Sequence, residues 1–346
     1  MLQGLALTPP VIGRIAIGKV VERAGRHLPE KDDEFTITSQ VQNKDGWILH
    51  PLDAWLRRDI HGKLRSIPVR LLFNDPDLSL RASYSMFDRS TGRPLCVGDG
   101  NTCKRQTLHG MQAFACPAPE GCSIAREGMC KPYARMHVRI DVHDAESDSD
   151  SEPQEMAGDE LACFILRTTG FNTIRTLATR LRYFHAVSGG LLASLPLELR
   201  LRGKSTTLSH RAPIYFVDLT VRHGLSMAQA LEQARIRSRK LQESGFDQEA
   251  LDAAARSGLA FGAFEESEEE GASVVEEFYP DAETGREAMP DQVDQARPDS
   301  GIGSASRTVT LRGKLARRFQ GARVDGDGNL SKDPAATEGG AAPMET

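Results

Sequence analysis

The sequence has few aromatic residues, no long apolar run and no segment that resembles a secretion signal. Aromatic residues make up 6% of the 346 positions, and only two are tryptophan. No run approaches the roughly 18 apolar residues that a membrane span needs, and the start of the chain lacks the basic residues of a signal peptide. These absences predict a cytoplasmic protein that does not enter a membrane.

The common catalytic motifs are missing as well. The sequence contains no H-E-x-x-H, no G-x-x-x-x-G-K-[ST] and no G-x-S-x-G. It therefore lacks the patterns of the best-known metalloproteases, nucleotide-binding proteins and serine hydrolases. We expect no catalytic residue and a protein that is not an enzyme. The net charge of -5 is small for this length, but the charge is distributed unevenly along the chain.

Cysteines are few, yet they are clustered. Five of the six fall within 35 residues: Cys96, Cys103, Cys116, Cys122 and Cys130. Proline and glycine residues separate them, which predicts that the thiols lie on turns. Thiolates brought together by short turns suit Zn²⁺ in a closed structural site. Two alternatives stay open at this stage: a scatter of free buried cysteines, and a disulfide cluster, which a reducing compartment disfavours.

Histidine offers a different ligand set for the same region. His109 lies between the cysteines and His137 lies just beyond them, so a mixed Cys/His zinc site is conceivable, as in a zinc hydrolase. A closed cage of thiolates is the simpler interpretation. The sixth cysteine, Cys163, lies in an apolar stretch, and we expect it to be a small core residue.

Apolar periodicity predicts an α+β fold with a β-rich body. A helix from Thr173 with apolar residues at helical spacing is expected to start at an Asn172 N-cap and to end at Gly189-Gly190. Further helices are expected at residues 226–245, with Ser226 as N-cap, and at 247–256. Alternating residues predict strands at 12–18, 35–41, 66–73, 80–85, 135–142, 161–166, 197–202 and 214–221.

Composition divides the chain into four parts. Residues 1–142 form a β-rich part that contains the cysteine loop at 96–130, and residues 161–264 form an α+β part with C-terminal helices. Between them, residues 143–160 carry eight acidic residues and no aromatic one. Residues 265–346 form a charged tail, in which positions 265–294 contain twelve acidic residues and one basic residue. The acidic insertion and the tail are expected to be disordered, because they contain too little apolar surface to order themselves.

A basic stretch lies in the α+β part. Residues 161–225 contain nine Lys or Arg against two acidic residues. Such an excess is a candidate surface for DNA phosphates, with an ordinary solvated face as the alternative. Tyr183 and Tyr215 lie among the charges and are candidates for stacking on bases. The candidate DNA-binding residues are Arg167, Arg175, Arg182, Arg200, Arg202 and Lys204.

The order of these features resembles a known family. The sequence runs from Cys116-Pro117 through Cys122 to Cys130-Lys131-Pro132, then through Arg167-Thr-Thr-Gly-Phe-Asn172 to Leu195-Pro-Leu197. From about Pro10 to Arg222 this resembles the recombination directionality factors of phages and mobile elements, whose proteobacterial relatives carry labels such as "hydrolase or metal-binding protein". The acidic insertion and the long tail depart from that pattern.

The resemblance implies specific roles. Cys96, Cys116, Cys122 and Cys130 would hold the metal, with Cys103 as an extra or alternate ligand. The protein would be a zinc-stabilised, DNA-associated accessory factor that binds a serine integrase and switches it from insertion to excision. Its partners would be DNA, an integrase, or both. The alternatives are a single-stranded DNA-binding protein with an oligonucleotide-binding barrel and, as a lesser one, a zinc-dependent hydrolase.

Overall fold

The computed structural model describes residues 10–23, 26–44, 46–57, 62–125, 129–141, 162–205, 207, 213–261, 274–275 and 278. All of them belong to one compact unit, residues 1–287. The acidic insertion at 143–160 and nearly all of the tail from 265 onward lie outside the described residues.

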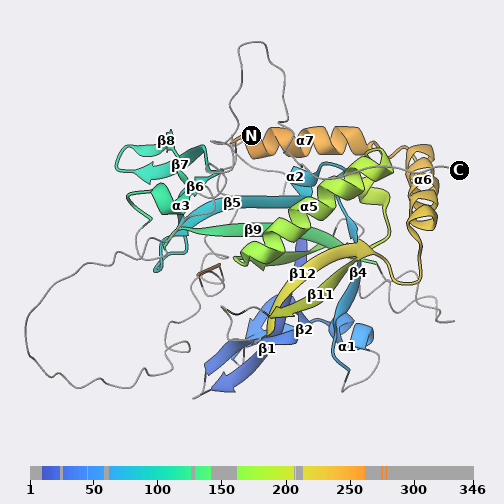
Figure 1. Ribbon diagram of the computed structural model, residues 1–346, viewed down its shortest axis with the longest axis horizontal. Coiled ribbons are helices and arrows are strands. Elements are labelled where there is room, and N and C mark those ends of the chain that lie inside the picture. Colours follow the sequence, from blue (N-terminus) through green and yellow to red (C-terminus); the bar gives the residue numbers. More distant parts are fainter. Residues whose placement is uncertain are drawn as a thin grey trace, which may run out of the picture. The chain divides into compact units, whose positions relative to one another are not determined.

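Twelve strands of the described part pair into one mixed sheet (Figure 1). Eight of them cover the stretches that alternation predicts, and the other four are short additions. The strands are β1 Val11–Arg23, β2 Arg26–Asn43, β3 Gly46–Leu49, β4 Ser66–Leu71, β5 Leu80–Phe87, β6 Pro94–Gly98, β7 Thr102–Thr107, β8 Gly110–Ala115, β9 Lys131–Ile140, β10 Cys163–Thr168, β11 Leu197–Ser205 and β12 Pro213–Val221.

The sheet branches at β9. One edge of β9 pairs with β10, from which the order continues through β1 and β2 to β3. The other edge pairs first with β5 and then, over Val138–Ile140, with β4. The β5 branch leads through β6 and β7 to β8, and the β4 branch leads through β11 to β12. Strands from both sides of residues 143–160 therefore share one sheet, and the described pairs do not close into a barrel.

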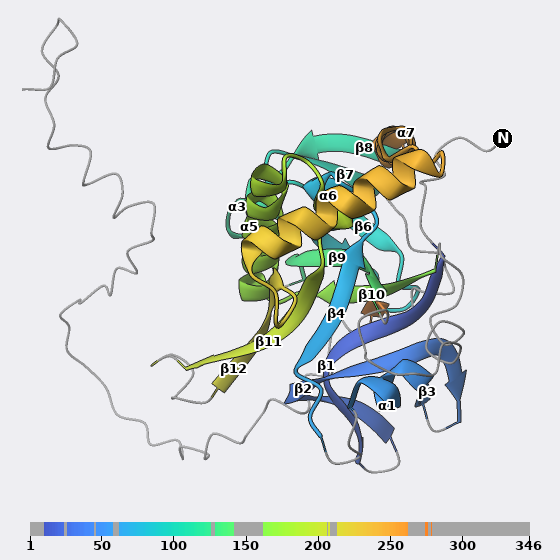
Figure 2. The ribbon, with the colours of Figure 1, turned by 90° about the vertical axis from the view of Figure 1, so that its right-hand side faces the viewer.

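Helices cover one face of this sheet and its end (Figure 2). The longest is α5, which packs on β12 and also touches β5 and β9. The two C-terminal helices α6 and α7 follow β12, as the sequence predicts. The bounds are α1 Pro51–Arg57, α2 Pro76–Ser79, α3 Ala118–Gly121, α5 Phe171–Ser188, the 3₁₀ turn η2 Leu192–Ser194, α6 Met227–Glu243 and α7 Gln248–Phe261.

The ends of the helices test the sequence signals directly. Gly189 ends α5 in the left-handed region, at φ 66°, and donates its backbone N–H to the carbonyls of Ala186 and His185, as predicted. Ser226 caps α6 in a reciprocal capping box with Gln229, also as predicted. The predicted Asn172 cap is wrong. The N-cap position of α5 is Gly170, and the Asn172 side chain instead accepts a hydrogen bond of 2.8 Å from Lys204.

The core lies between α5 and the face of the sheet beneath it. Leu177, Leu181 and Phe184 of α5 are buried at 0–3% exposure and belong to the same apolar cluster as Met136 and Val138 of β9. Side chains return to the same face about every 3.6 residues on the helix and every second residue on the strand. Apolar residues at these spacings give each element one apolar face, and the two faces pack together. Burial of such a side chain stabilises the fold by about 1.5–3 kcal/mol relative to its exposed state. The α+β class is thus confirmed.

The opposite face of the central strands is charged, and much of it is nevertheless buried. Alternation on β9 correctly separates Met136, Val138 and Ile140 from His137 and Arg139. The sequence analysis did not say what covers this second face, on which His137 of β9 and Arg81 of β5 are only 3% and 8% exposed. A charged pattern identifies the face and cannot show that other parts of the chain cover it.

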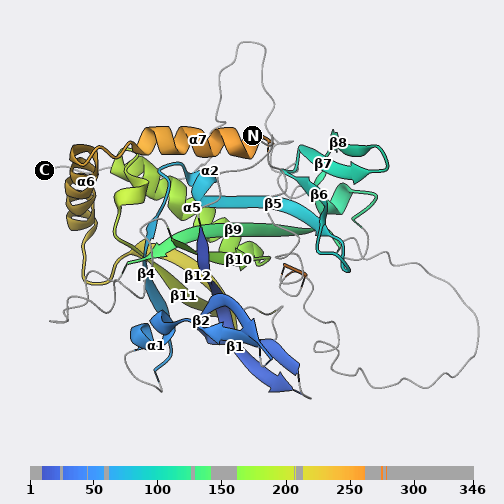
Figure 3. The same cartoon turned by 180° about the vertical axis from the view of Figure 1, so that it is seen from behind.

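A short part of the tail contacts this second face. Val274 and Phe278 are fully buried in one cluster with Phe87 of β5 and Tyr133 of β9. The described part of this segment lies beside β10 in two views at a right angle to each other (Figures 2 and 3). The prediction that everything after residue 264 is disordered is therefore too broad at these positions. The sequence analysis overlooked a small apolar group within an acidic stretch.

Candidate metal centre and basic surface

The five clustered cysteines converge from five positions of the fold. Cys96 lies on β6 and Cys103 on β7, whereas Cys116 follows β8, Cys122 follows α3 and Cys130 precedes β9. The prediction that all five thiols lie on turns is therefore wrong for the first two. The local sequence is poor in aliphatic residues, which hid these strands from a search by alternation.

A tight turn places the first two thiols next to each other. The Asp99 carboxylate accepts hydrogen bonds from the backbone N–H groups of Asn101 and Thr102, at 2.7 and 2.8 Å, and these bonds lower the pKa of Asp99. Gly100 takes φ +97°, which glycine adopts without strain. The turn pairs Gly98 with Cys103 across β6 and β7.

Gly98 lets a third thiol approach this hairpin. A Cβ at this position would lie 2.8 Å from the sulfur of Cys116 and 2.7 Å from the Cβ of Cys103. Real Cβ atoms do not come so close to such neighbours, so any side chain here would displace the thiols. The sequence analysis gave Gly98 no role, because the strand that places it opposite Cys103 has no alternating pattern.

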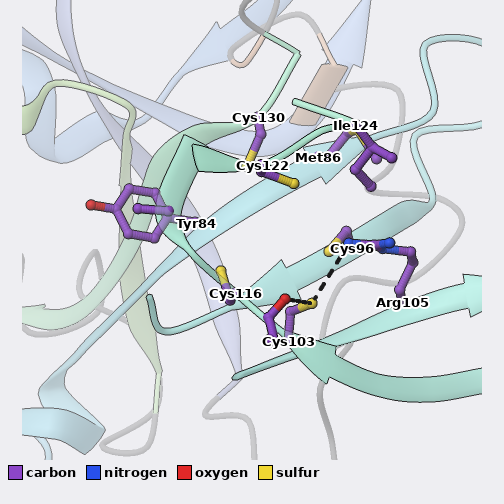
Figure 4. A pocket seen from close by; sticks show the side chains of 11 residues that line it. Tyr84, Met86, Cys96, Cys103, Arg105, Cys116, Cys122, Ile124 and Cys130 are labelled. Atoms are coloured by element: carbon purple, nitrogen blue, oxygen red, sulfur yellow. Dashed lines mark hydrogen bonds between the residues drawn. The ribbon is translucent and has the colours of Figure 1, made fainter. Parts of the chain in front are cut away.

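All five cysteine side chains line one small cavity (Figure 4). Its volume is about 10 Å³, enough for about one water-sized sphere. Tyr84, Met86 and Ile124 complete much of the apolar wall. All six cysteines of the chain, Cys163 included, are free thiols. The disulfide alternative therefore finds no support in the structure.

The thiols affect one another electrostatically. Burial, together with hydrogen bonding to Cys96, raises the pKa of the Cys103 thiol to about 11. Burial and the charges of the four neighbouring thiolates raise the pKa of Cys130 to about 12. The Arg105 guanidinium lies 4.0 Å from the Cys103 sulfur and opposes the first of these shifts. Arg105 is a further member of the site that the sequence analysis missed.

Five thiols that line one cavity do not by themselves form a metal site. Within the described residues, no group of three or more His, Cys, Asp or Glu side chains has the arrangement of a metal site. The donors therefore fit zinc in type and number, but the described residues do not bring them into the arrangement of a metal site. The site is a cavity lined by five thiols.

The two histidines and the sixth cysteine lie elsewhere. His109 is exposed in the β7–β8 turn, His137 is buried on β9, and neither lines the cavity. The described residues thus do not assemble the mixed Cys/His site of a zinc hydrolase. Cys163 is fully buried on β10, as expected for a core residue, and burial raises the pKa of its thiol to about 12.

The predicted DNA-binding residues do not form one surface. Arg175 and Arg182 are exposed on α5, as predicted, and Arg182 lies 3.9 Å from the exposed Asp77. Arg200 pairs with Glu198 at 2.5 Å, and Lys204 binds Asn172. Arg202 shares the buried carboxylate of Asp218 with Arg180, at 3.2 and 2.9 Å. Ion pairing therefore neutralises part of the basic excess that the sequence shows.

Arg167 lies apart from the other five. It aligns with Arg135 of β9 and belongs to the charged face of the sheet, opposite α5. Arg135 and Arg81, which the sequence analysis did not select, lie in the same row across the strands. The sequence does indicate that both arginines lie on the polar face of their strands, because they occupy the polar positions of alternating stretches. Their proximity depends on strand register, which the sequence does not reveal.

Similarity to known proteins places the chain in a family. A family model described as Gp3-like, recombination directionality factor-like, matches residues 12–222. The matched stretch includes the sheet, α5 and every clustered cysteine. Neither a curated protein nor a solved structure matches the chain. None of the described helices has the length and hydropathy needed to cross a bilayer. Because the match spans more than half of the sequence, the chain belongs to the Gp3-like, recombination directionality factor-like family.

Proposed function

We propose that this protein is a non-catalytic accessory factor that sets the direction of a serine integrase on DNA. The observation that carries the proposal is the family match over residues 12–222. In this role the protein contacts the integrase, the DNA it holds, or both, and favours excision over insertion. It needs shape and charge for this task rather than a reacting group.

The proposal includes one structural zinc ion per chain. Cys96, Cys116, Cys122 and Cys130 would hold it, with Cys103 as the alternate ligand to Cys96. Support comes from the five free thiols around one small cavity and from Gly98, which admits Cys116 to the hairpin. Bound zinc would keep its thiolates ionised and would tie β6 and β7 to β9.

The exposed arginines of α5 are the proposed contacts to DNA. Arg175 and Arg182 lie two turns apart on the helix and point away from the core residues Leu177 and Leu181. A guanidinium group in this setting can bind a phosphate with little desolvation. Arg200, Arg202 and Lys204 are weaker candidates because each has a partner at 2.5–3.2 Å, whereas Arg182 lies 3.9 Å from the exposed Asp77.

A recombination assay tests the main proposal. The purified protein is added to a serine integrase encoded by the same element, with either the insertion substrates attP and attB or the excision substrates attL and attR. We expect excision to appear only when the protein is present and insertion to fall. Cys130→Ser should lose this effect, whereas the matched Cys163→Ser variant should keep it. No change in either direction of recombination would refute the integrase role.

Single-stranded DNA binding is a second candidate, favoured by one observation. Tyr183 on α5 is 49% exposed and lies next to Arg182, so its ring is available to stack on an unpaired base. In that case Tyr183→Ala should weaken binding to single strands by about 1–3 kcal/mol and have little effect on duplex. Equal loss on both forms of DNA would exclude this candidate.

A further inference from the structure

Three strands of the branched sheet, β3, β8 and β12, pair with one neighbour among the described strands. The other edge of such a strand can accept a second chain unless the strand is short, charged or covered. The edge of β12 is covered, because its Val217 N–H donates to the Thr173 hydroxyl at 3.2 Å. The next outward N–H, of Leu219, donates to the Asp218 carboxylate at 2.9 Å. The strand β3 is short, with four residues.

β8 has none of these protections. Its sequence, Gly-Met-Gln-Ala-Phe-Ala, contains no charged residue and no proline, and five of its six residues are exposed. Met111 and Phe114 are 40% and 39% exposed, and Leu108 in the adjoining turn is fully exposed. Figure 1 shows β8 beyond β7, on the side away from β5. An uncharged, apolar edge of this kind is a template for pairing with another chain.

The register of β7 and β8 shows which backbone groups face the open edge. Cys116 donates its N–H to the Asn101 carbonyl at 2.8 Å, and this pair continues the register of the two strands. In an antiparallel pair, residues that bond to the neighbouring strand alternate with residues whose N–H and C=O point away from it. Gln112 therefore bonds to β7, whereas Met111 and Ala113 direct their backbone groups to the open edge.

We propose that β8 pairs antiparallel with β8 of a second copy of this chain, across a two-fold axis at Gln112. Met111 of each copy then lies opposite Ala113 of the other. Both of these residues have outward backbone groups, so each pair exchanges two hydrogen bonds. The result is one sheet that continues through both copies. This inference goes beyond the proposed integrase role and does not rest on it.

The side chains of β8 fit a second copy in this register. The large Met111 faces the small Ala113, and Phe114 faces Gly110. A Cβ placed at Gly110 would have no atom within 4 Å, so the ring of the other copy finds open space there. The two Gln112 amides meet at the axis, where each offers a donor and an acceptor. Like charges are not opposed, because β8 contains none.

Sedimentation velocity of the full-length protein over a range of concentrations tests the pairing. A strand of six residues is small beside the roughly 20–30 residues per partner of a standard interface, so we expect a weak dimer that dissociates on dilution. Ala113→Pro should stay monomeric. It removes an outward donor but no bond to β7, and an edge strand tolerates proline at such a position. A monomeric wild type at every concentration, or a dimer that Ala113→Pro retains, would overturn the proposal.

A matched pair of lysine variants shows which edge is used. Met111 of β8 and Ile48 of β3 are 40% and 42% exposed, so the two side chains are comparable. Met111→Lys should weaken the dimer, because a charge on an edge strand opposes pairing, whereas Ile48→Lys should dimerise like the wild type. The opposite result would assign the interface to β3 and contradict the proposal.

The axis residue provides a test that does not depend on loss of pairing alone. Gln112→Glu and Gln112→Lys each place two like charges opposite each other, and each should weaken its homodimer at least about fivefold. An equimolar mixture of the two variants should form a heterodimer with nearly wild-type affinity, since a carboxylate then faces an ammonium group. A mixture that associates no more tightly than the separate variants would overturn the two-fold pairing and leave the integrase role untouched.

Discussion

Two regions of the molecule are stabilised in different ways: the central strands with α5, and the cysteine hairpins formed by β6, β7 and β8. In the first region, apolar residues of two layers meet, and Leu177, Leu181 and Met136 are fully buried. In the second, β8 has no buried residue and β7 has one, Cys103. The comparison indicates that burial can hold the first region together and cannot hold the second.

The apolar cluster of the cysteine hairpins is small. Its buried members are Met86, Cys96 and Cys103, and Phe114 on β8 remains 39% exposed. So little burial does not offset the loss of chain entropy on ordering two hairpins. Regions of this kind commonly depend on a crosslink or a metal ion. This deficit is an independent physical reason to place zinc among the thiols.

Loss of the proposed zinc should have the largest effect. We expect Cys130→Ser to lose its metal, and with it a binding free energy on the order of 10 kcal/mol that is largely folding energy of the hairpins. Metal analysis and hydrogen exchange of residues 94–116 measure the two consequences. Cys163→Ser is the control and should retain one zinc ion. Protein that contains no zinc as purified, or a Cys130→Ser variant with protected hairpins, would contradict the comparison.

A cavity in the main core should come next. Leu181→Ala removes a fully buried side chain between α5 and the sheet, and we expect it to reduce the free energy of unfolding by about 2–5 kcal/mol. Urea unfolding measures this change. Zinc content should stay the same, because the cysteine hairpins do not depend on this contact. The neighbouring exposed residue provides the control: Tyr183→Ala should change stability by no more than about 0.5 kcal/mol.

The sequence predicts well what depends on local periodicity. The spacing of Leu177, Leu181 and Phe184 indicates both α5 and its buried face. Alternation on β9 likewise separates Met136 and Val138 from His137. These patterns are local, because a helix or strand with one apolar face must bury that face wherever it lies.

What depends on long-range pairing could not be predicted. The parallel pair of β1 and β10 joins segments about 150 residues apart, and its register decides which side chains become neighbours. For that reason Arg167 was grouped with Arg175 and Arg182, although it lies on the other face of the sheet. The cysteine cluster was correctly recognised as a group, but its strands β6 and β7 contain few apolar residues and gave no alternating signal.

Acid should affect the two regions through different groups: His137 in the central strands and the thiols in the cysteine hairpins. The pKa of His137 is lowered to about 3 in the fold, whereas an unfolded histidine titrates near 6.5. The unfolded state therefore binds more protons between these values. Stability from the neutral ring is complete above pH 6.5 and is lost as the pH falls toward 3, by up to about 1.4 kcal/mol per pH unit.

His137→Gln should flatten this dependence. Chemical unfolding at several pH values between 4 and 7 measures the slope in the wild type and in the variant. Zinc release from the thiols also follows the pH, so a zinc-sensitive dye records it separately in the same samples. We expect the dye signal to be identical in the two proteins. Equal slopes for wild type and variant would show that His137 is protonated in the fold, contrary to its buried setting.

The smallest expected effect concerns the exposed arginines of the main region, and a matched pair makes it measurable. Arg175 and Arg182 are exposed on α5, whereas Arg180 and Arg202 share the buried carboxylate of Asp218. If the first pair binds duplex phosphates, changing both to Gln should make the plot of log binding constant against log salt concentration less steep, by about 0.9 per lost contact. Stability should change little.

Arg180→Gln with Arg202→Gln should instead lower the free energy of unfolding, because a buried carboxylate loses its partners. Titrations with duplex DNA at several salt concentrations, with and without integrase, distinguish the outcomes. Identical slopes for wild type and the Arg175/Arg182 variant would show that this helix face does not touch DNA.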